Sequence, residues 1–166
     1  MIRLPTEEKL PSRPDPGSSS LSTPIWFMDT SVFLRALLGD SPAAAEWINS
    51  QRRAGAEFYA SRLLAVEAYR TVLNKTLLGM DDFGAAAVDS AIGMFSLVDV
   101  TDQILDDACV LRAVLRAADA IHVATALALG TVTLVTHDAQ MAAAARTLGL
   151  AVTDPVTDDV GRPPVA

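Results

Sequence analysis

The sequence predicts one α/β domain, with a central parallel sheet of about four to five strands flanked by helices. Short apolar runs alternate with segments of helical spacing, a pattern typical of parallel sheets wrapped in helices. The length of 166 residues suits a single domain, and 51% apolar residues suffice for a sizeable core. We expect this domain to span residues 24–154, between a flexible N-terminal extension at 1–23 and an irregular tail at 155–166, because both ends contain several Pro and lack a hydrophobic period.

The first part of the domain opens with the apolar run IWFM, which predicts a buried strand ending near Asp29. Pro42 favours the start of a helix, because a residue in the first helical turn needs no N–H donor. The elements expected up to residue 100 are helices at 31–38, 42–52, 62–78 and 81–94, and further strands at 57–61 and 96–100.

The second part continues the alternation. Helices are expected at 102–116 and 119–129, and they should meet at a corner near 117–118. The run TVTLVT predicts a strand at 131–136, and LAVTD predicts a last strand at 150–154. A helix at 139–148 separates these two strands.

Composition narrows the classes of function. Lys and Arg number 13 against 20 Asp and Glu, which gives a net charge of −7. An acidic chain is a poor general binder of nucleic acid, so any such role needs local basic patches or bound cations. No apolar stretch approaches the roughly 20 residues of a membrane span. A single cysteine, Cys109, excludes a disulfide within one chain and fits a reducing cytoplasm, where we expect the protein to act.

Two acids follow predicted strands at the edge of the sheet where ligands bind in this fold class. Asp29 comes directly after IWFM, and Asp138 comes shortly after the strand at 131–136. Each also precedes a predicted helix, and Asp is a favoured N-cap worth about 1 kcal/mol. Taken singly, capping is the simpler interpretation of both.

Two more acids stand in apolar surroundings. Asp119 opens the helix IHVATALAL, which looks largely buried, although a first-turn Asp also complements the helix dipole. His122, one turn later, could be a core histidine bonded to backbone, a metal ligand or a partner of Asp119; we expect the first. Glu67 lies mid-helix and cannot be a cap, so it is either an exposed partner of Arg70 or partly buried at the edge of the apolar stripe.

These four acids could converge at one end of the sheet. Carboxylates within a few ångströms of each other repel and raise each other's pKa unless a cation neutralises them. A set of oxygen ligands suits Mg²⁺ or Mn²⁺, and such a site can orient water for phosphodiester hydrolysis without a protein nucleophile.

The chain resembles the PIN-domain nucleases, and most closely the VapC-type toxins of bacterial toxin–antitoxin pairs. The resemblance rests on MDTSV (28–32), on Glu67 in LLAVEAYR, on LRAADAIHVATAL (115–127) and on LVTHDAQMAAAARTLGL (134–150). It implies that Asp29, Glu67, Asp119 and Asp138 are the metal-binding acids of the family. It also gives supporting roles to Ser31 and Thr136 and places Arg116 near substrate or partner, while His122 matches no metal ligand.

The resemblance implies a Mg²⁺-dependent endoribonuclease, with Mn²⁺ as a possible substitute, that forms a homodimer and is paired with a VapB-like antitoxin. A metal-activated water would attack the scissile phosphate in line and leave a 5′-phosphate and a 3′-hydroxyl. The candidate RNA contacts are Arg35, Arg52, Arg53, Arg112 and Arg116, and ordinary solubility explains these arginines equally well.

Other functions remain open at this point. A phosphatase of the haloacid-dehalogenase kind needs a second Asp two residues after the first, where this chain has Ser31. An RNA-processing PIN nuclease outside a toxin–antitoxin pair, or a PIN scaffold without catalysis, fits the same motifs.

Overall fold

The chain folds around a five-stranded parallel sheet. The computed structural model describes residues 23–79, 84–130 and 132–156, and in them the strand order is β3-β2-β1-β4-β5. All neighbouring strands run parallel. The strands are β1 Ile25–Met28, β2 Glu57–Ser61, β3 Ser96–Val98, β4 Thr133–Val135 and β5 Ala151–Thr153. The predicted fold class is confirmed.

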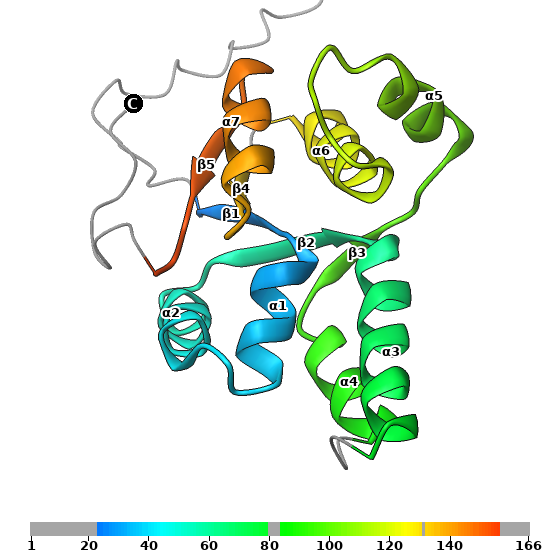
Figure 1. Cartoon of the computed structure of the whole chain (residues 1–166). Coiled ribbons are helices and arrows are strands. Elements are labelled where there is room, and N and C mark those ends of the chain that lie inside the picture. Colours follow the sequence, from blue (N-terminus) through cyan, green and yellow to red (C-terminus); the bar gives the residue numbers. More distant parts are fainter. Residues whose placement is uncertain (1–22, 80–83, 131, 157–166) are drawn as a thin grey trace, which may run out of the picture.

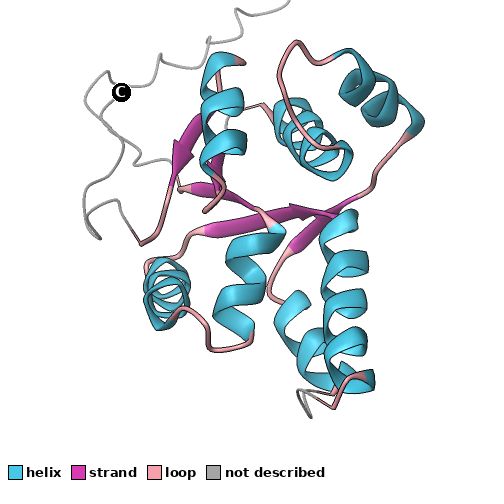
Figure 2. Ribbon diagram, viewed as in Figure 1, coloured by secondary structure: helices cyan, strands magenta, loops and turns pink. Residues whose placement is uncertain are grey.

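Helices cover both faces of the sheet (Figure 1). On one face lie α1 Thr30–Leu37, α2 Pro42–Arg53, α3 Arg62–Leu77 and α4 Ala85–Ile92. On the other lie α5 Asp102–Val110, α6 Ala117–Leu129 and α7 Ala139–Thr147. Figure 2 shows the resulting three layers, helices, sheet and helices. This arrangement follows from the alternation of strands and helices along the sequence, since each crossover between parallel strands places its helix on a face of the sheet.

The central strand β1 supplies side chains to two separate cores. Trp26 and Met28 belong to the cluster packed with α1 to α4, whereas Phe27 belongs to the cluster packed with α6 and α7. Successive side chains of a strand point to opposite faces, so a strand covered on both sides is apolar at every position. This explains why IWFM shows no polar alternation.

The largest boundary error concerns the segment after α5. A helix was expected at 102–116, but α5 ends at Val110 and α6 begins at Ala117. Leu111 and Leu115 pack against the core beneath α6 and α7 instead. Gln140 of α7 also donates a hydrogen bond to the backbone oxygen of Val114 at 2.9 Å. These tertiary contacts outweigh the helix propensity of residues that include neither Gly nor Pro.

The remaining boundaries differ little from the expected ones. The helix α4 starts at Ala85, while the expected start at Asp81 lies outside the described residues. The same holds for nearly all of the extension at 1–23 and the tail at 155–166, so both domain boundaries stay predictions. Among the described residues, no helix is both long and apolar enough to span a bilayer.

Candidate active site

The site lies where the strand order reverses. The strands β1 and β4 are neighbours, yet β1 leads into α1 on one face and β4 leads into α7 on the other. Such a divergence opens a crevice beyond the carboxyl ends of the two strands, and ligands of open α/β sheets bind there. Asp29 follows β1 directly, and Thr136 and Asp138 follow β4.

Asp29 is held by hydroxyl groups rather than by its own helix. Its side chain is almost fully buried, with 4% exposed. Ser31 donates to Oδ2 at 2.5 Å, and Thr136 donates to the same oxygen at 3.0 Å. Asp29 occupies the N-cap position of α1 but makes no side-chain capping bond, so the capping interpretation is wrong here. Ser31 and Thr136 therefore lie beside this acid, and the supporting roles that the resemblance gives them stay predictions.

Asp138 does cap its helix. Its Oδ1 accepts a hydrogen bond from the backbone N–H of Met141 at 2.9 Å, at the start of α7. Its own backbone N–H donates to Thr136 Oγ1 at 3.0 Å. Thr136 therefore binds Asp29 through its proton and orients Asp138 through its oxygen, which couples the ends of β1 and β4.

Glu67 projects from α3 into a hydrogen-bonded cluster. Thr30 donates to Oε2 at 2.5 Å, and His122 Nε2 lies 2.9 Å from the same oxygen. Burial by itself raises the pKa of Glu67, but the bonds from His122 and Thr30 outweigh it and leave this pKa below its usual value. Glu67 is half-buried and does not pair with Arg70, which donates to Asn74 instead.

Asp119 is the third residue of α6, one turn in from the N-cap Arg116. Burial and the negative charges of Asp29 and Asp138 raise the pKa of Asp119 above its usual value. A backbone hydrogen bond from Arg116 and the charge of that residue only partly offset this rise. Burial is the larger cause of this rise, and the charges of the two neighbouring carboxylates add to it.

All four acids line one pocket of about 400 Å³, together with Ser31 and Arg116. They come from α3, from α6 and from the residues that follow β1 and β4, and they meet only because the sheet brings those elements together. Its polar lining also includes Thr30, Arg70 and His122.

The predicted arginines do not all lie at this pocket. Arg116 lines it, whereas Arg35 and Arg112 are exposed residues outside its lining. Arg53 forms an exposed ion pair with Glu46 at 2.7 Å, and Arg52 donates to the sulfur of Met94. Sequence reasoning missed Arg70, whose position three residues after Glu67 was interpreted only as an ion pair.

His122 is buried, with 1% exposed, but its partners differ from those expected. It was predicted to bond the backbone, whereas both ring nitrogens contact side chains: Ser61 at 2.8 Å through Nδ1, and Glu67 through Nε2. A polar residue carried into an apolar core needs partners, and those partners proved to be the hydroxyl and carboxyl groups of the site.

The acids fit a hydrated magnesium ion by their chemistry. In the described residues no three Asp, Glu, His or Cys side chains stand close enough to hold a metal as they are. A protein usually holds Mg²⁺ through only one or two carboxylates, with waters and substrate phosphate completing the shell. Hydrogen bonds from the described residues occupy Asp29 Oδ2, Glu67 Oε2 and Asp138 Oδ1, and each of these carboxylates keeps its other oxygen for a cation.

A family model for the PIN domain matches residues 26–147, which is most of the chain. The chain belongs to the PIN domain family. The PIN fold therefore positions these four acids, and PIN domains are generally nucleases. A comparison with curated proteins gave no match to the sequence.

Solved structures share the fold of this PIN domain at low sequence identity. VapBC2 from Rickettsia felis, solved with a DNA fragment from its promoter, superposes with a TM-score of 0.62 at 14% identity, covering 78% of this chain and 98% of that one. A toxin–antitoxin complex from Klebsiella pneumoniae gives 0.55 at 19% identity, over 78% and 96%. PAE2754 from Pyrobaculum aerophilum gives 0.56 at 21% identity, over 92% and 94%.

Proposed function

We propose that this PIN domain is a Mg²⁺-dependent endoribonuclease and acts as the toxin of a VapBC-type toxin–antitoxin pair. The observation that carries the proposal is the convergence of Asp29, Glu67, Asp119 and Asp138 on one pocket. The PIN family match and the fold shared with two toxin–antitoxin complexes also support the proposal. Such an enzyme would act in the cytoplasm, where its RNA is.

The four carboxylates would hold one or two Mg²⁺, with Mn²⁺ as a possible substitute. When bound, the metal supplies charge stabilisation at the scissile phosphate and lowers the pKa of water. A cation bound beside Asp119 would oppose the burial and the negative charges of Asp29 and Asp138 that raise the pKa of this acid. Ser31 and Thr136 hold the buried carboxylate of Asp29 in one orientation through its Oδ2.

Two arginines supply the fixed positive charge that an acidic pocket needs to receive a phosphate. Among the residues that the structure describes, Arg116 and Arg70 are the only Arg or Lys side chains that line it. A guanidinium group binds a phosphate through two parallel hydrogen bonds, so these residues are suited to orient the RNA backbone. The net charge of −7 makes such local contacts necessary.

The proposal is tested by RNA cleavage with purified wild-type protein, Asp29→Asn and Asp40→Asn. Asp40 is an exposed acid beyond the opposite end of α1 and serves as the matched control. We expect Mg²⁺-dependent cleavage by the wild type and by Asp40→Asn, and a loss of about 100-fold or more with Asp29→Asn. Equal rates for all three proteins would reject the assignment.

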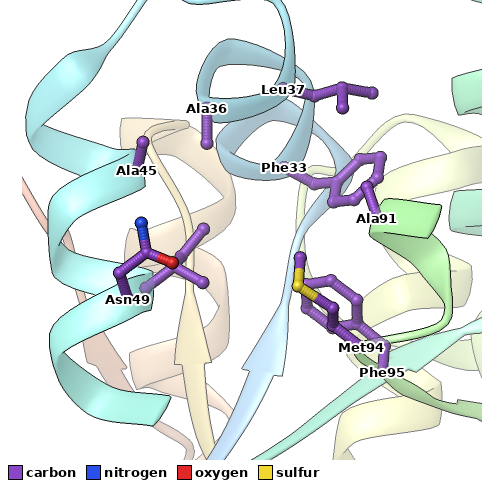
Figure 3. A pocket seen from close by; sticks show the side chains of 9 residues that line it. Phe33, Ala36, Leu37, Ala45, Asn49, Ala91, Met94 and Phe95 are labelled. Carbon is purple, nitrogen blue, oxygen red and sulfur yellow. The ribbon is translucent and has the colours of Figure 1, made fainter. Parts of the chain in front are cut away.

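An apolar groove suits the antitoxin. It has a volume of about 230 Å³ and lies between α1, α2 and the end of α4. Phe33, Leu37, Ala45 and Met94 are among the residues that line it (Figure 3). Leu34, next to Phe33, lines the acidic pocket, so a bound helix in the groove could extend a basic side chain toward the carboxylates.

A homodimer is the assembly that the resemblance implies, and one face of α3 suits it. Val66, Tyr69, Leu73 and Leu77 recur at helical spacing and are exposed, between 37% and 75%. The opposite face of α3 is buried through Leu64, Ala68 and Val72. Light scattering of the purified protein tests this proposal: a monomer at micromolar concentration would count against it.

Two rivals use the same fold. A PIN scaffold without catalysis predicts that calorimetry detects no Mg²⁺ or Mn²⁺ binding at the pocket. A processing nuclease outside a toxin–antitoxin pair predicts normal cleavage but no partner for the apolar groove. The presence of all four acids in one pocket favours an active enzyme.

A further inference from the structure

The buried imidazole of His122 joins the two helical layers at the active site. His122 belongs to α6 on one face of the sheet, while Thr30 of α1 and Glu67 of α3 lie on the other face (Figure 1). Its Nε2 lies 2.9 Å from Glu67 Oε2 and 3.2 Å from Thr30 Oγ1. Its Nδ1 lies 2.8 Å from Ser61 Oγ, at the end of β2.

The directions of these hydrogen bonds follow from which atoms carry protons. An ionised carboxylate only accepts, so the contact between Nε2 and Glu67 requires a proton on Nε2. Ser61 can then donate its hydroxyl proton to Nδ1, and Thr30 donates to Glu67. A neutral imidazole with its proton on Nε2 satisfies every one of these contacts without burying an additional charge.

The hydroxyl of Ser61 contacts His122 instead of capping the helix that follows it. Ser61 is the N-cap residue of α3, where a serine usually accepts a hydrogen bond from the first helical turn, yet it makes no capping bond. It is fully buried, and its hydroxyl contacts His122 instead. By contrast, Ser41 caps α2 by accepting from the N–H of Ala44 at 3.2 Å.

We propose that Ser61 and His122 are positioning residues that fix the Glu67 carboxylate for metal binding. The carboxylate of Glu67 keeps the imidazole proton on Nε2, and Ser61 holds the ring in place by donating to Nδ1. His122 Nε2–H together with Thr30 then holds Oε2 of Glu67, which leaves Oε1 for the cation. The inference rests on the proposed metal-dependent function, because it assigns a purpose to the orientation of Glu67. Outer partners of this kind typically alter metal affinity by 10-fold to 100-fold.

The tautomer is tested on the folded, metal-free protein by nitrogen NMR of labelled histidine. We expect His122 to carry its proton on Nε2 and to have an unprotonated Nδ1. In Ser61→Ala the proton should stay on Nε2, because Glu67 still accepts it, whereas the signal of the unprotonated Nδ1 should shift because that nitrogen loses its hydrogen bond. A wild-type ring with its proton on Nδ1 alone would overturn the proposal. This readout involves neither metal nor RNA, so it does not depend on the proposed nuclease activity.

The positioning role is tested by Mn²⁺ titration of His122→Gln and His122→Met. The two side chains have similar length, but only glutamine can donate a hydrogen bond to Glu67. We expect Met to weaken Mn²⁺ binding about 10-fold or more and Gln to retain most of the affinity. If both variants bind Mn²⁺ as tightly as the wild type, His122 serves packing alone and the proposal fails.

A second pair of variants covers the case in which a core substitution at His122 prevents folding. Ser61→Ala should weaken Mn²⁺ binding, whereas Ser41→Ala should lower the melting temperature and leave Mn²⁺ binding unchanged. Equal Mn²⁺ affinity in these two variants would contradict the role of Ser61. If the wild type binds no Mn²⁺ at all, the metal-dependent function fails, while the NMR result still decides the arrangement of His122.

Discussion

Thr136 and Asp29, which are 107 positions apart in sequence, are joined by a buried hydrogen bond of 3.0 Å. The bond connects the ends of β1 and β4 at the point where their helices diverge to opposite faces. Because Thr136 also accepts from the backbone N–H of Asp138, one hydroxyl fixes the relative placement of two acids. The pairing of β1 with β4 therefore determines how Asp29 and Asp138 are placed in the pocket.

Replacing Thr136 with Val should both destabilise the protein and slow RNA cleavage. The substitution leaves a buried carboxylate with one donor fewer, which costs about 2 kcal/mol for a bond to a charged group. Thr125→Val is the matched control, because Thr125 is equally buried and donates only to the backbone oxygen of Ile121. Urea unfolding and cleavage rates measure the two effects, and a Thr125 variant that loses as much activity would contradict the role of Thr136.

Asp119→Asn should stabilise the metal-free protein at neutral pH. The folded state raises the pKa of Asp119 above its ordinary value of 3.8, so it favours the protonated form. The corresponding stability is fully present below that ordinary value and is lost as pH rises through the raised pKa. Asparagine removes this loss and can still accept the hydrogen bond from Arg116.

Thermal unfolding without metal measures the effect. The melting temperature of Asp119→Asn should exceed that of the wild type at pH 7, and the difference should shrink at low pH. Asp106→Asn, at an exposed acid of α5, is the control and should change little. A lower melting temperature for Asp119→Asn throughout would show that folding does not raise the pKa of Asp119.

The effect of an arginine substitution on RNA binding should depend on whether that arginine lines the acidic pocket. Arg70→Gln and Arg116→Gln should each weaken RNA binding about 10-fold and reduce the salt dependence of binding by about one ion, because both side chains line the acidic pocket. Arg35→Gln and Arg112→Gln should have smaller effects, since these exposed residues lie outside it. Fluorescence anisotropy at several salt concentrations provides the comparison. Equal effects at all four positions would indicate a diffuse RNA surface instead.

The apolar groove should accept a helix of the antitoxin. Ala45 lines the groove, so Ala45→Trp should fill it and weaken antitoxin binding at least about 10-fold, or 1.4 kcal/mol. Ala43→Trp places the same side chain at an exposed position of α2 outside the groove lining. Calorimetry with the cognate antitoxin measures both, and RNA cleavage should be normal in each. Unchanged antitoxin binding by Ala45→Trp would place the partner elsewhere.

The sequence predicted the order of the elements well because hydrophobic periodicity reports local burial. IWFM predicted a strand buried on both sides, and the structure places it at the centre of the sheet. The end of α5 could not be predicted, because it depends on the packing of Leu111 and Leu115 and on the bond from Gln140 to Val114. Those contacts join residues that are distant in sequence.

The sequence allowed the acids of the candidate site to be predicted, but not their convergence or their hydrogen-bond partners. The order of the four acids could be read from the motifs, whereas their convergence depends on the strand order β2-β1-β4. Single positions gave mixed results, since Asp138 caps its helix and Asp29 does not. The sequence did not indicate that Ser61 contacts His122, because the two residues are 61 positions apart. A serine before a helix normally predicts an N-cap instead.

We propose that these four carboxylates together form a metal-dependent ribonuclease site. Total RNA incubated with wild-type protein and with Asp119→Asn, each with Mg²⁺ and with chelator, tests it most directly when the new RNA ends are mapped. We expect discrete cuts bearing 5′-phosphates, made only by the wild type and only with Mg²⁺. Identical cuts by Asp119→Asn, or cuts that persist in chelator, would contradict it.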